Sequence, residues 1–203
     1  MEALSLPYLF TKMMIENSPN QNSIFENTKI ERLEYSDNQV IATTSYGNKI
    51  RANKIIASTG FNYDLFTSSE LCEKFISYSI VTKPIKNLRW KNNTLVQDYL
   101  EPYHYLRTLP DNRIIFGGED TPYKNIISDK QANKIYLKLL KKLKNTLPEY
   151  LQQIEVEYNF CGLFGTTENN LGMIGYSDNP SVLYFLSCGA NGIINAMFGI
   201  EII

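Results

Sequence analysis

The chain has 203 residues, of which 43% are hydrophobic and 12% aromatic, enough to bury one or two hydrophobic cores. Twenty basic and twenty-one acidic side chains give a formal net charge of −1, so no global field favours nucleic acid or an anionic membrane surface. The three cysteines are odd in number and far apart in sequence. This spacing argues against a disulfide framework or a zinc site and favours a reducing, cytoplasmic location.

Two segments bear on membranes and export. The first residues, Met1-Glu2-Ala3-Leu4, carry an acid where a signal peptide would carry lysine or arginine. The uncharged stretch 181–200 is about as long as a membrane-spanning helix. Glycines and asparagines interrupt it, whereas a bilayer demands uninterrupted helix of lipid-exposed backbone. We therefore expect no export signal and no membrane partner, and we interpret 181–200 as a buried strand, a glycine turn and a helix.

The first third of the chain predicts a helix followed by a β-meander. Pro7 stands where its missing N–H costs nothing, at the start of a short amphipathic helix that ends by residues 17–22. Strand-like runs follow at 29–35, 39–45 and 49–58, separated by turn residues. Residues 54–60 form an apolar run that ends in small residues and a glycine. In α/β sheets such endings bring backbone close to a ligand, although a plain tight turn gives the same pattern.

The middle of the chain predicts strands at 76–81, 94–99, 103–108 and 113–116, the last two joined by a hairpin turn. A helix follows at 129–147, with Leu139 and Leu143 on its apolar face and Pro148 as its stop. Six lysines on this helix are compatible with a nucleic-acid groove, but without interleaved aromatic residues a solvated face is the better interpretation. An extended segment at 155–164, a loop at 165–170, a strand at 182–187 and a closing helix complete the chain.

Five segments carry a family pattern in a fixed order. They are Phe25 to Ile30, Ile56 to Gly60, Tyr103 to Asp120, Thr167 to Gly175 and Gly189 to Ile193. In this order they resemble the middle and C-terminal part of the D-amino-acid oxidase, glycine oxidase and sarcosine oxidase superfamily of FAD-dependent oxidoreductases. Three residues depart from the family's usual pattern: Asn169 replaces an acid, Gly172 a proline and Ala190 a glycine.

The resemblance implies a mixed α+β and α/β fold with two domains. Residues 1–74 and 165–203 would form part of an FAD-binding domain, from a β-meander, a closing strand and a C-terminal helix. Residues 75–164 would form a substrate domain with a mostly antiparallel sheet and a covering helix. The residues implied at the FAD are Ile30, Ser58, Thr59, Gly60, Gly189, Ala190, Asn191, Gly192 and Ile193. Independently, glycines that open a helix leave free N–H groups that can face an electron-rich ligand. A helix start packed tightly under a strand would give the same sequence pattern.

The resemblance also implies a small-molecule amine or amino acid as substrate, oxidised at its C–N bond. Tyr103, Tyr105 and Arg107 alternate along one strand and share a face, so an arginine clamp and tyrosine hydroxyls are available for a carboxylate. Glu119 is a candidate for the substrate's ammonium, or else a solvent-exposed turn acid. His104 is expected to point away from the three, and we assign it no catalytic role. We assign no catalytic residue and no metal site.

The chain contains no G-x-G-x-x-G segment, which in such flavoproteins places the pyrophosphate at a helix N-terminus. We therefore expect an N-terminally truncated oxidoreductase, inactive alone. The alternatives are a non-catalytic remnant or binding module, and one subunit of a split flavoenzyme completed by an N-terminal chain. Uncovered apolar faces and strand edges also predict self-association.

Overall fold

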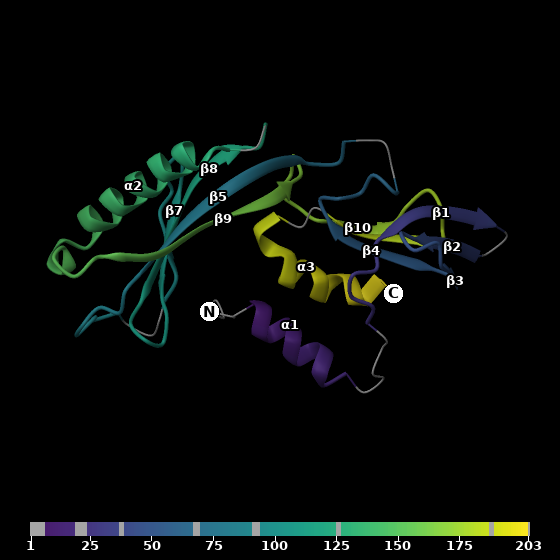
Figure 1. The fold of residues 1–203 in the computed structure, drawn as a ribbon, viewed down its shortest axis with the longest axis horizontal. Helices are drawn as coiled ribbons and strands as arrows, with labels where there is room; N and C mark the ends of the chain where they lie inside the picture. The colour runs from purple at the N-terminus through teal and green to yellow at the C-terminus, as the bar shows by residue number, and fades with distance from the viewer. Residues whose placement is uncertain are drawn as a thin grey trace. The chain divides into compact units, whose positions relative to one another are not determined.

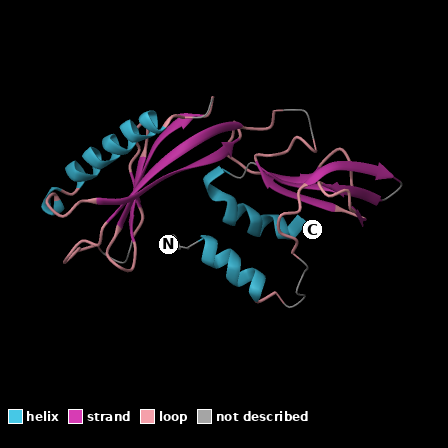
Figure 2. Cartoon of the chain, in the orientation of Figure 1, coloured by secondary structure: helices cyan, strands magenta, loops and turns pink. Residues whose placement is uncertain are grey.

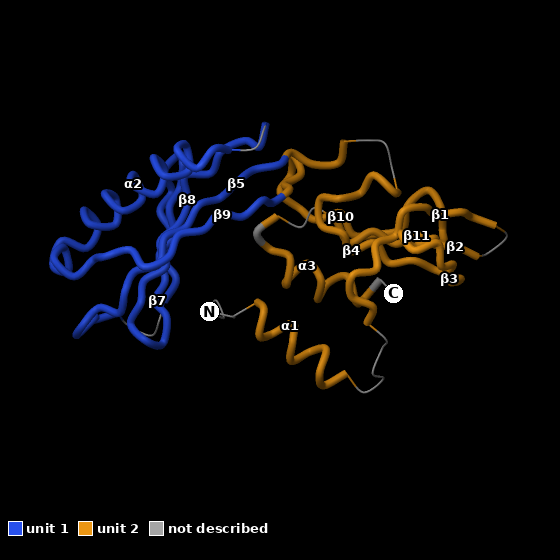
Figure 3. The backbone as a smooth tube through the Cα atoms, in the orientation of Figure 1, with its two compact units in different colours: residues 1–4, 74–164 blue, residues 5–73, 165–203 orange. Residues whose placement is uncertain are grey.

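The computed structural model describes residues 7–18, 24–36, 39–66, 70–90, 94–124, 127–186 and 189–202. The chain divides into two compact units, which are coloured separately in Figure 3. Unit 1 is formed by Lys74–Phe164, and unit 2 by Ser5–Glu73 with Gly165–Ile203. Helices and strands of both units together give the mixed fold class that the sequence predicts (Figure 2).

Unit 1 contains a five-stranded sheet with the order β6-β7-β8-β5-β9 and the helix α2 (Figure 1). Strand β8 pairs antiparallel with both β5 and β7, and β6 pairs antiparallel with β7. The bounds are β5 Glu73–Thr82, β6 Val96–Gln97, β7 His104–Thr108, β8 Ile114–Pro122, α2 Asp129–Thr146 and β9 Val156–Thr166. Strand β6 is much shorter than the predicted 94–99, and β8 is much longer than the predicted 113–116.

The core of unit 1 lies between α2 and the sheet. Leu139 and Leu143 are fully buried on one side of the helix, and they belong to the same cluster as Tyr78, Ile80 and Phe116 of the sheet. Helix α2 begins after Ser128, whose backbone N–H donates to the side-chain carbonyl of Gln131, and it ends before Pro148. The apolar stripe and the stop at proline confirm the predicted helix and its buried face.

Unit 2 contains two three-stranded sheets. Strands β1 (Ile30–Ser36), β2 (Gln39–Thr44) and β3 (Lys49–Ala52) form the predicted antiparallel meander. Strand β4 (Ile55–Gly60) leaves it and pairs parallel with β11 (Val182–Leu186), which pairs antiparallel with β10 (Met173–Tyr176). The prediction of one run over 49–58 was wrong, because the chain changes partner at Asn53-Lys54. The four-residue β10, which follows Gly172 directly, was not predicted.

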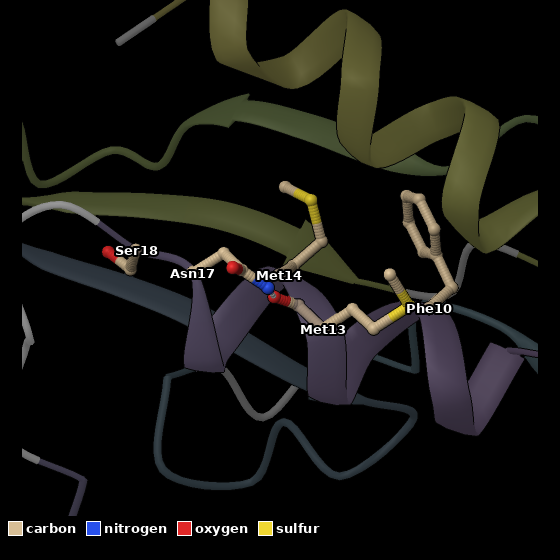
Figure 4. A pocket seen from close by; sticks show the side chains of 5 residues that line it. All are labelled: Phe10, Met13, Met14, Asn17 and Ser18. Atoms are coloured by element: carbon tan, nitrogen blue, oxygen red, sulfur yellow. Dashed lines mark hydrogen bonds between the residues drawn. The ribbon is translucent and has the colours of Figure 1, made fainter.

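Helix α1 (Pro7–Glu16) and helix α3 (Gly192–Gly199) also belong to unit 2. The predicted helix at Pro7 is confirmed, but none of its residues is buried. Phe10, Met13 and Met14 line a shallow apolar hollow together with Asn17 and Ser18 (Figure 4). Within the described residues no helix combines the length and hydrophobicity needed to cross a membrane.

The packing of α2 makes a stability prediction. We expect Leu143→Ala to lower the free energy of unfolding by about 2–5 kcal/mol, because the fully buried side chain leaves a cavity. Leu137 lies on the same helix and is 66% exposed, so Leu137→Ala should change stability by no more than about 0.5 kcal/mol. Urea unfolding followed by circular dichroism measures both, and equal losses in the two variants would contradict the packing described.

Candidate functional site

Strand β7 separates two sets of side chains in unit 1. His104, Leu106 and Thr108 are buried, whereas Tyr105 and Arg107 between them are only half-buried. Leu106 belongs to the core beneath α2, so Tyr105 and Arg107 lie on the opposite face of the sheet. We call the face opposite α2 the open face; it is defined by Tyr105 and Arg107, which are half-buried, and by Ser79 and Gly117, which are buried. As predicted, His104 lies on the side away from Tyr105 and Arg107.

The Tyr105 side chain is held flat on the open face. Its ring lies over Gly117 of β8, where a Cβ atom would collide with the ring and with its hydroxyl group. The Tyr105 hydroxyl is 2.8 Å from Ser79 Oγ on the neighbouring strand β5. A larger residue at 117 would displace the Tyr105 ring, so the glycine lets the ring lie against the sheet, and Ser79 positions the Tyr105 hydroxyl.

Tyr103 lies beside Tyr105, and its hydroxyl lies near Asp120, an acid that the sequence pattern did not single out. The two rings are 6.4 Å apart and tilted by 34°. The Tyr103 hydroxyl can donate a hydrogen bond to the neighbouring Asp120 carboxylate. Burial, together with the Asp120 charge, raises the pKa of the Tyr103 hydroxyl far above its ordinary value. Tyr103 therefore remains a neutral hydrogen-bond donor to Asp120.

A β-bulge in β8 decides where the two neighbouring acids point. Ile76 pairs with Thr121 and Tyr78 pairs with Gly118, so Glu119 and Asp120 together lie opposite one residue of β5. Gly118 and Glu119 have φ values of +131° and +57°. Glycines inside a strand pattern often mark such bulges, and Gly117-Gly118 was the signal available in the sequence.

The structure does not bring Glu119 together with Tyr103, Tyr105 and Arg107. Glu119 is 7% exposed; its Oε1 lies 2.9 Å from His104 Nε2, and its Oε2 accepts a hydrogen bond from Lys138 of α2. The other imidazole nitrogen of His104, Nδ1, lies 3.0 Å from Asp98 Oδ2. Glu119 is thus a buried, ion-pairing residue on the helix side of the sheet. The alternative interpretation of Glu119 as a solvent-exposed turn acid was wrong, because its side chain is buried.

These partners shift the pKa of the Glu119 carboxyl. Burial acts to raise it, but the hydrogen bonds and charges of Lys138 and His104 outweigh burial and hold it below its usual value. The pKa of the Asp98 carboxyl is likewise lowered, because hydrogen bonds from His104 and Leu100 outweigh its desolvation. Both carboxylates therefore stabilise the folded unit at neutral pH.

In unit 2 the parallel strands β4 and β11 end at the same edge of their sheet. Gly60, the last residue of β4, pairs with Leu186, the last residue of β11. Gly60 and Gly189 have φ values of +65° and +55°. A Cβ at Gly60 would meet no described atom within 4 Å, and one at Gly189 would meet atoms only at 4.0 Å. Backbone without side chains at the ends of parallel strands is where α/β sheets bring a ligand close.

The other implied FAD residues fall in two places. Ser58 and Thr59 precede Gly60 in β4 and are exposed. Gly189–Asn191 forms a 3-10 turn that leads into α3 at Gly192, with Ile193 in its first turn. Ser58 and Thr59 thus lie in the last part of β4, and Gly189 to Ile193 lie after the end of β11, whereas Ile30 opens β1 in the separate meander sheet. Ser187, the last residue of the predicted strand 182–187, lies outside the described residues.

The ion pairs of Glu119 predict a pH dependence. Its folded-state pKa is lowered, so its contribution is fully present above the unfolded value of about 4.3 and is lost as pH falls through the folded pKa. We expect Glu119→Gln to lower stability by about 1–3 kcal/mol at pH 7. The difference from the unsubstituted protein should shrink below about pH 5. Urea unfolding at several pH values measures it, and a difference constant from pH 7 to pH 3 would contradict the role of Glu119.

Solved structures share this fold at low sequence identity. Iminodiacetate oxidase from Chelativorans sp. BNC1 matches with a TM-score of 0.74 and 14% identity over 96% of this chain and 52% of that chain. L-proline dehydrogenase from P. horikoshii matches with a TM-score of 0.72 and 16% identity over 95% of this chain and 53% of that chain. Glycine oxidase from Geobacillus kaustophilus matches with a TM-score of 0.66 and 15% identity over 89% of this chain and 48% of that chain.

The chain therefore spans about half the length of these structures. No curated protein matches its sequence. The family profile described as DAO, FAD dependent oxidoreductase, matches residues 7–202, which include both β4 with its glycine end and the whole of unit 1. The chain belongs to the DAO family of FAD-dependent oxidoreductases.

Proposed function

We propose that this chain carries the substrate-binding sheet and part of the FAD site of an oxidoreductase acting on the C–N bond of an amine or amino acid. The observation that carries the proposal is the open face of unit 1. There Tyr105 and Arg107 occupy the side of the sheet opposite α2, in a chain that belongs to an FAD-dependent family. The iminodiacetate and glycine oxidases that share its fold support an amine as the substrate class.

The open face supplies orientation, which is the protein's share of such a reaction. The Arg107 guanidinium can hold a substrate carboxylate through two parallel hydrogen bonds. The Tyr105 hydroxyl, fixed by Ser79 at 2.8 Å, offers a further hydrogen bond to the same group. A carboxylate held in this way presents the neighbouring carbon and its amine in one orientation.

FAD supplies hydride acceptance when it is bound. We assign the flavin to Ser58, Thr59, Gly60 and the residues from Gly189 to Ile193, because the family resemblance implies them and the side-chain-free backbone of Gly60 ends β4 beside the end of β11. By resemblance, the adenine is assigned to the backbone at Ile30. Residues 1–203 contain no G-x-G-x-x-G segment. We propose that a longer form of the protein or a second chain supplies it.

The FAD assignment is tested by a matched pair of glycine substitutions. Gly60 and Gly47 both have positive φ and open space where a Cβ would lie, so alanine strains either backbone to a similar degree. We expect FAD to bind and develop resolved flavin absorbance bands. Gly60→Ala should weaken FAD binding about tenfold or more, because the added methyl group prevents one close contact with the flavin. Gly47→Ala should leave FAD binding unchanged. A protein that is colourless after incubation with FAD and removal of the unbound FAD by gel filtration would overturn the proposal for this chain.

The substrate assignment is tested by Arg107→Ala in the enzyme that has been completed with the G-x-G-x-x-G segment and loaded with FAD. We expect KM for a carboxylated amine to rise about 10-fold or more, from the loss of charge-assisted hydrogen bonds. KM for an amine without a carboxylate should stay unchanged. Arg51 is exposed on β3, so Arg51→Ala serves as the matched control. Steady-state kinetics with both substrates decide the point, and an unaltered KM for the carboxylated amine would remove Arg107 from the site.

A further inference from the structure

Asp120 is the one acid on the open face of unit 1 that the structure brings beside Tyr103 and Tyr105, among the residues it describes. We propose that Asp120, with the rings of Tyr103 and Tyr105, binds the ammonium group of the substrate. This inference rests on the proposed function for the identification of the substrate as an amine. It replaces the role expected for Glu119 from the sequence, since Glu119 lies on the other face with its charge already paired.

The β-bulge explains why the roles of the two acids are exchanged. Phe116 faces the helix and Gly117 faces the open side. Strict alternation would put Glu119 on the open face and Asp120 beneath α2. The extra residue in β8 at Glu119 reverses this order after Gly118. The shorter side chain, Asp120, is therefore the one that reaches the Tyr103 hydroxyl.

The charge of Asp120 has no cationic partner in the described part of the chain, where its carboxylate contacts the hydroxyl of Tyr103. Its Oδ1 atom is buried and accepts no hydrogen bond there. Glu119, by contrast, forms an ion pair with Lys138 and lies 2.9 Å from His104 Nε2. A partly buried carboxylate held by a single neutral donor is poorly compensated. A cationic amine supplies both the opposite charge and N–H donors.

The two tyrosine rings fit the same ligand. Tyr103 and Tyr105 lie 6.4 Å apart, and the face of an aromatic ring attracts a cation within about 6 Å of its centre. Tyr103 keeps its proton, because burial and Asp120 raise its pKa. Its hydroxyl therefore continues to orient the carboxylate, while Ser79 fixes Tyr105. A neutral hydroxyl in place of the ammonium group would lose both the ionic and the aromatic contribution.

The test compares three small probes by isothermal titration calorimetry: glycine, methylammonium and glycolate, which carries a hydroxyl in place of the amine. The full chain is used, with and without added FAD. We expect Asp120→Asn to weaken glycine and methylammonium about tenfold or more and to leave glycolate unchanged. Asp64 is exposed, so Asp64→Asn, the same chemical change elsewhere, should alter none of the three. Circular dichroism verifies that each variant is folded.

Failure of this inference is distinguishable from failure of the proposed function. The ammonium site is overturned if the unsubstituted chain binds neither amine, or if Asp120→Asn binds the amines with the same affinity as the unsubstituted chain. Either outcome holds even if FAD binds at Gly60. Asp120-dependent amine binding without any FAD binding supports the ammonium site and overturns the flavin assignment. Tyr103→Phe gives a second measure, because it keeps the ring and removes the donor. It should weaken the two amines less than Asp120→Asn does.

Discussion

The packing of α2 against β5, β7 and β8 determines which face of the unit 1 sheet remains available for a ligand. Leu139 and Leu143 are fully buried there with Tyr78 and Ile80. Each strand residue that alternates out of this core is consequently turned to the open face. The positions of Tyr105 and Arg107 therefore depend on an apolar contact made by other residues, and the chemistry of the open face follows from the core.

The buried ion pairs strengthen this division. Glu119 is held by His104 and Lys138, and His104 is also held by Asp98. A buried carboxylate is tolerated only when its charge is matched, so these partners stabilise the bulge conformation at Glu119, where φ is +57°. The bulge in turn sends Asp120 toward Tyr103. Charge pairing beneath the helix thus controls which acid is presented on the opposite side.

In unit 2 the corresponding constraint is the parallel pairing of β4 with β11. The pairing of Gly60 with Leu186 places the two strand ends together, and the positive φ of Gly60 and Gly189 lets the backbone turn away there without a side chain. The chain covers about half of the solved structures that share its fold.

The sequence predicted the features that depend on local periodicity. The apolar stripe and Pro148 located α2, and period-two alternation separated His104 from Tyr105 and Arg107. It did not predict features set by pairing between distant segments. The break between β3 and β4 arises because β4 joins β11, about 130 residues later. The exchange of Glu119 and Asp120 arises from one inserted residue in β8, and alternation alone assigns those two acids to the wrong faces.

The most direct measurement of the central claim is a two-dimensional amide NMR titration of the chain, first with FAD and then with glycine. We expect FAD to shift the amide signals of residues 58–60 and 189–193, and glycine to shift those of Tyr105, Arg107 and Asp120. Signals of the α2 residues that face the core should stay in place. Shifts confined to other residues, or no shifts with either ligand, would contradict the assignment of both sites.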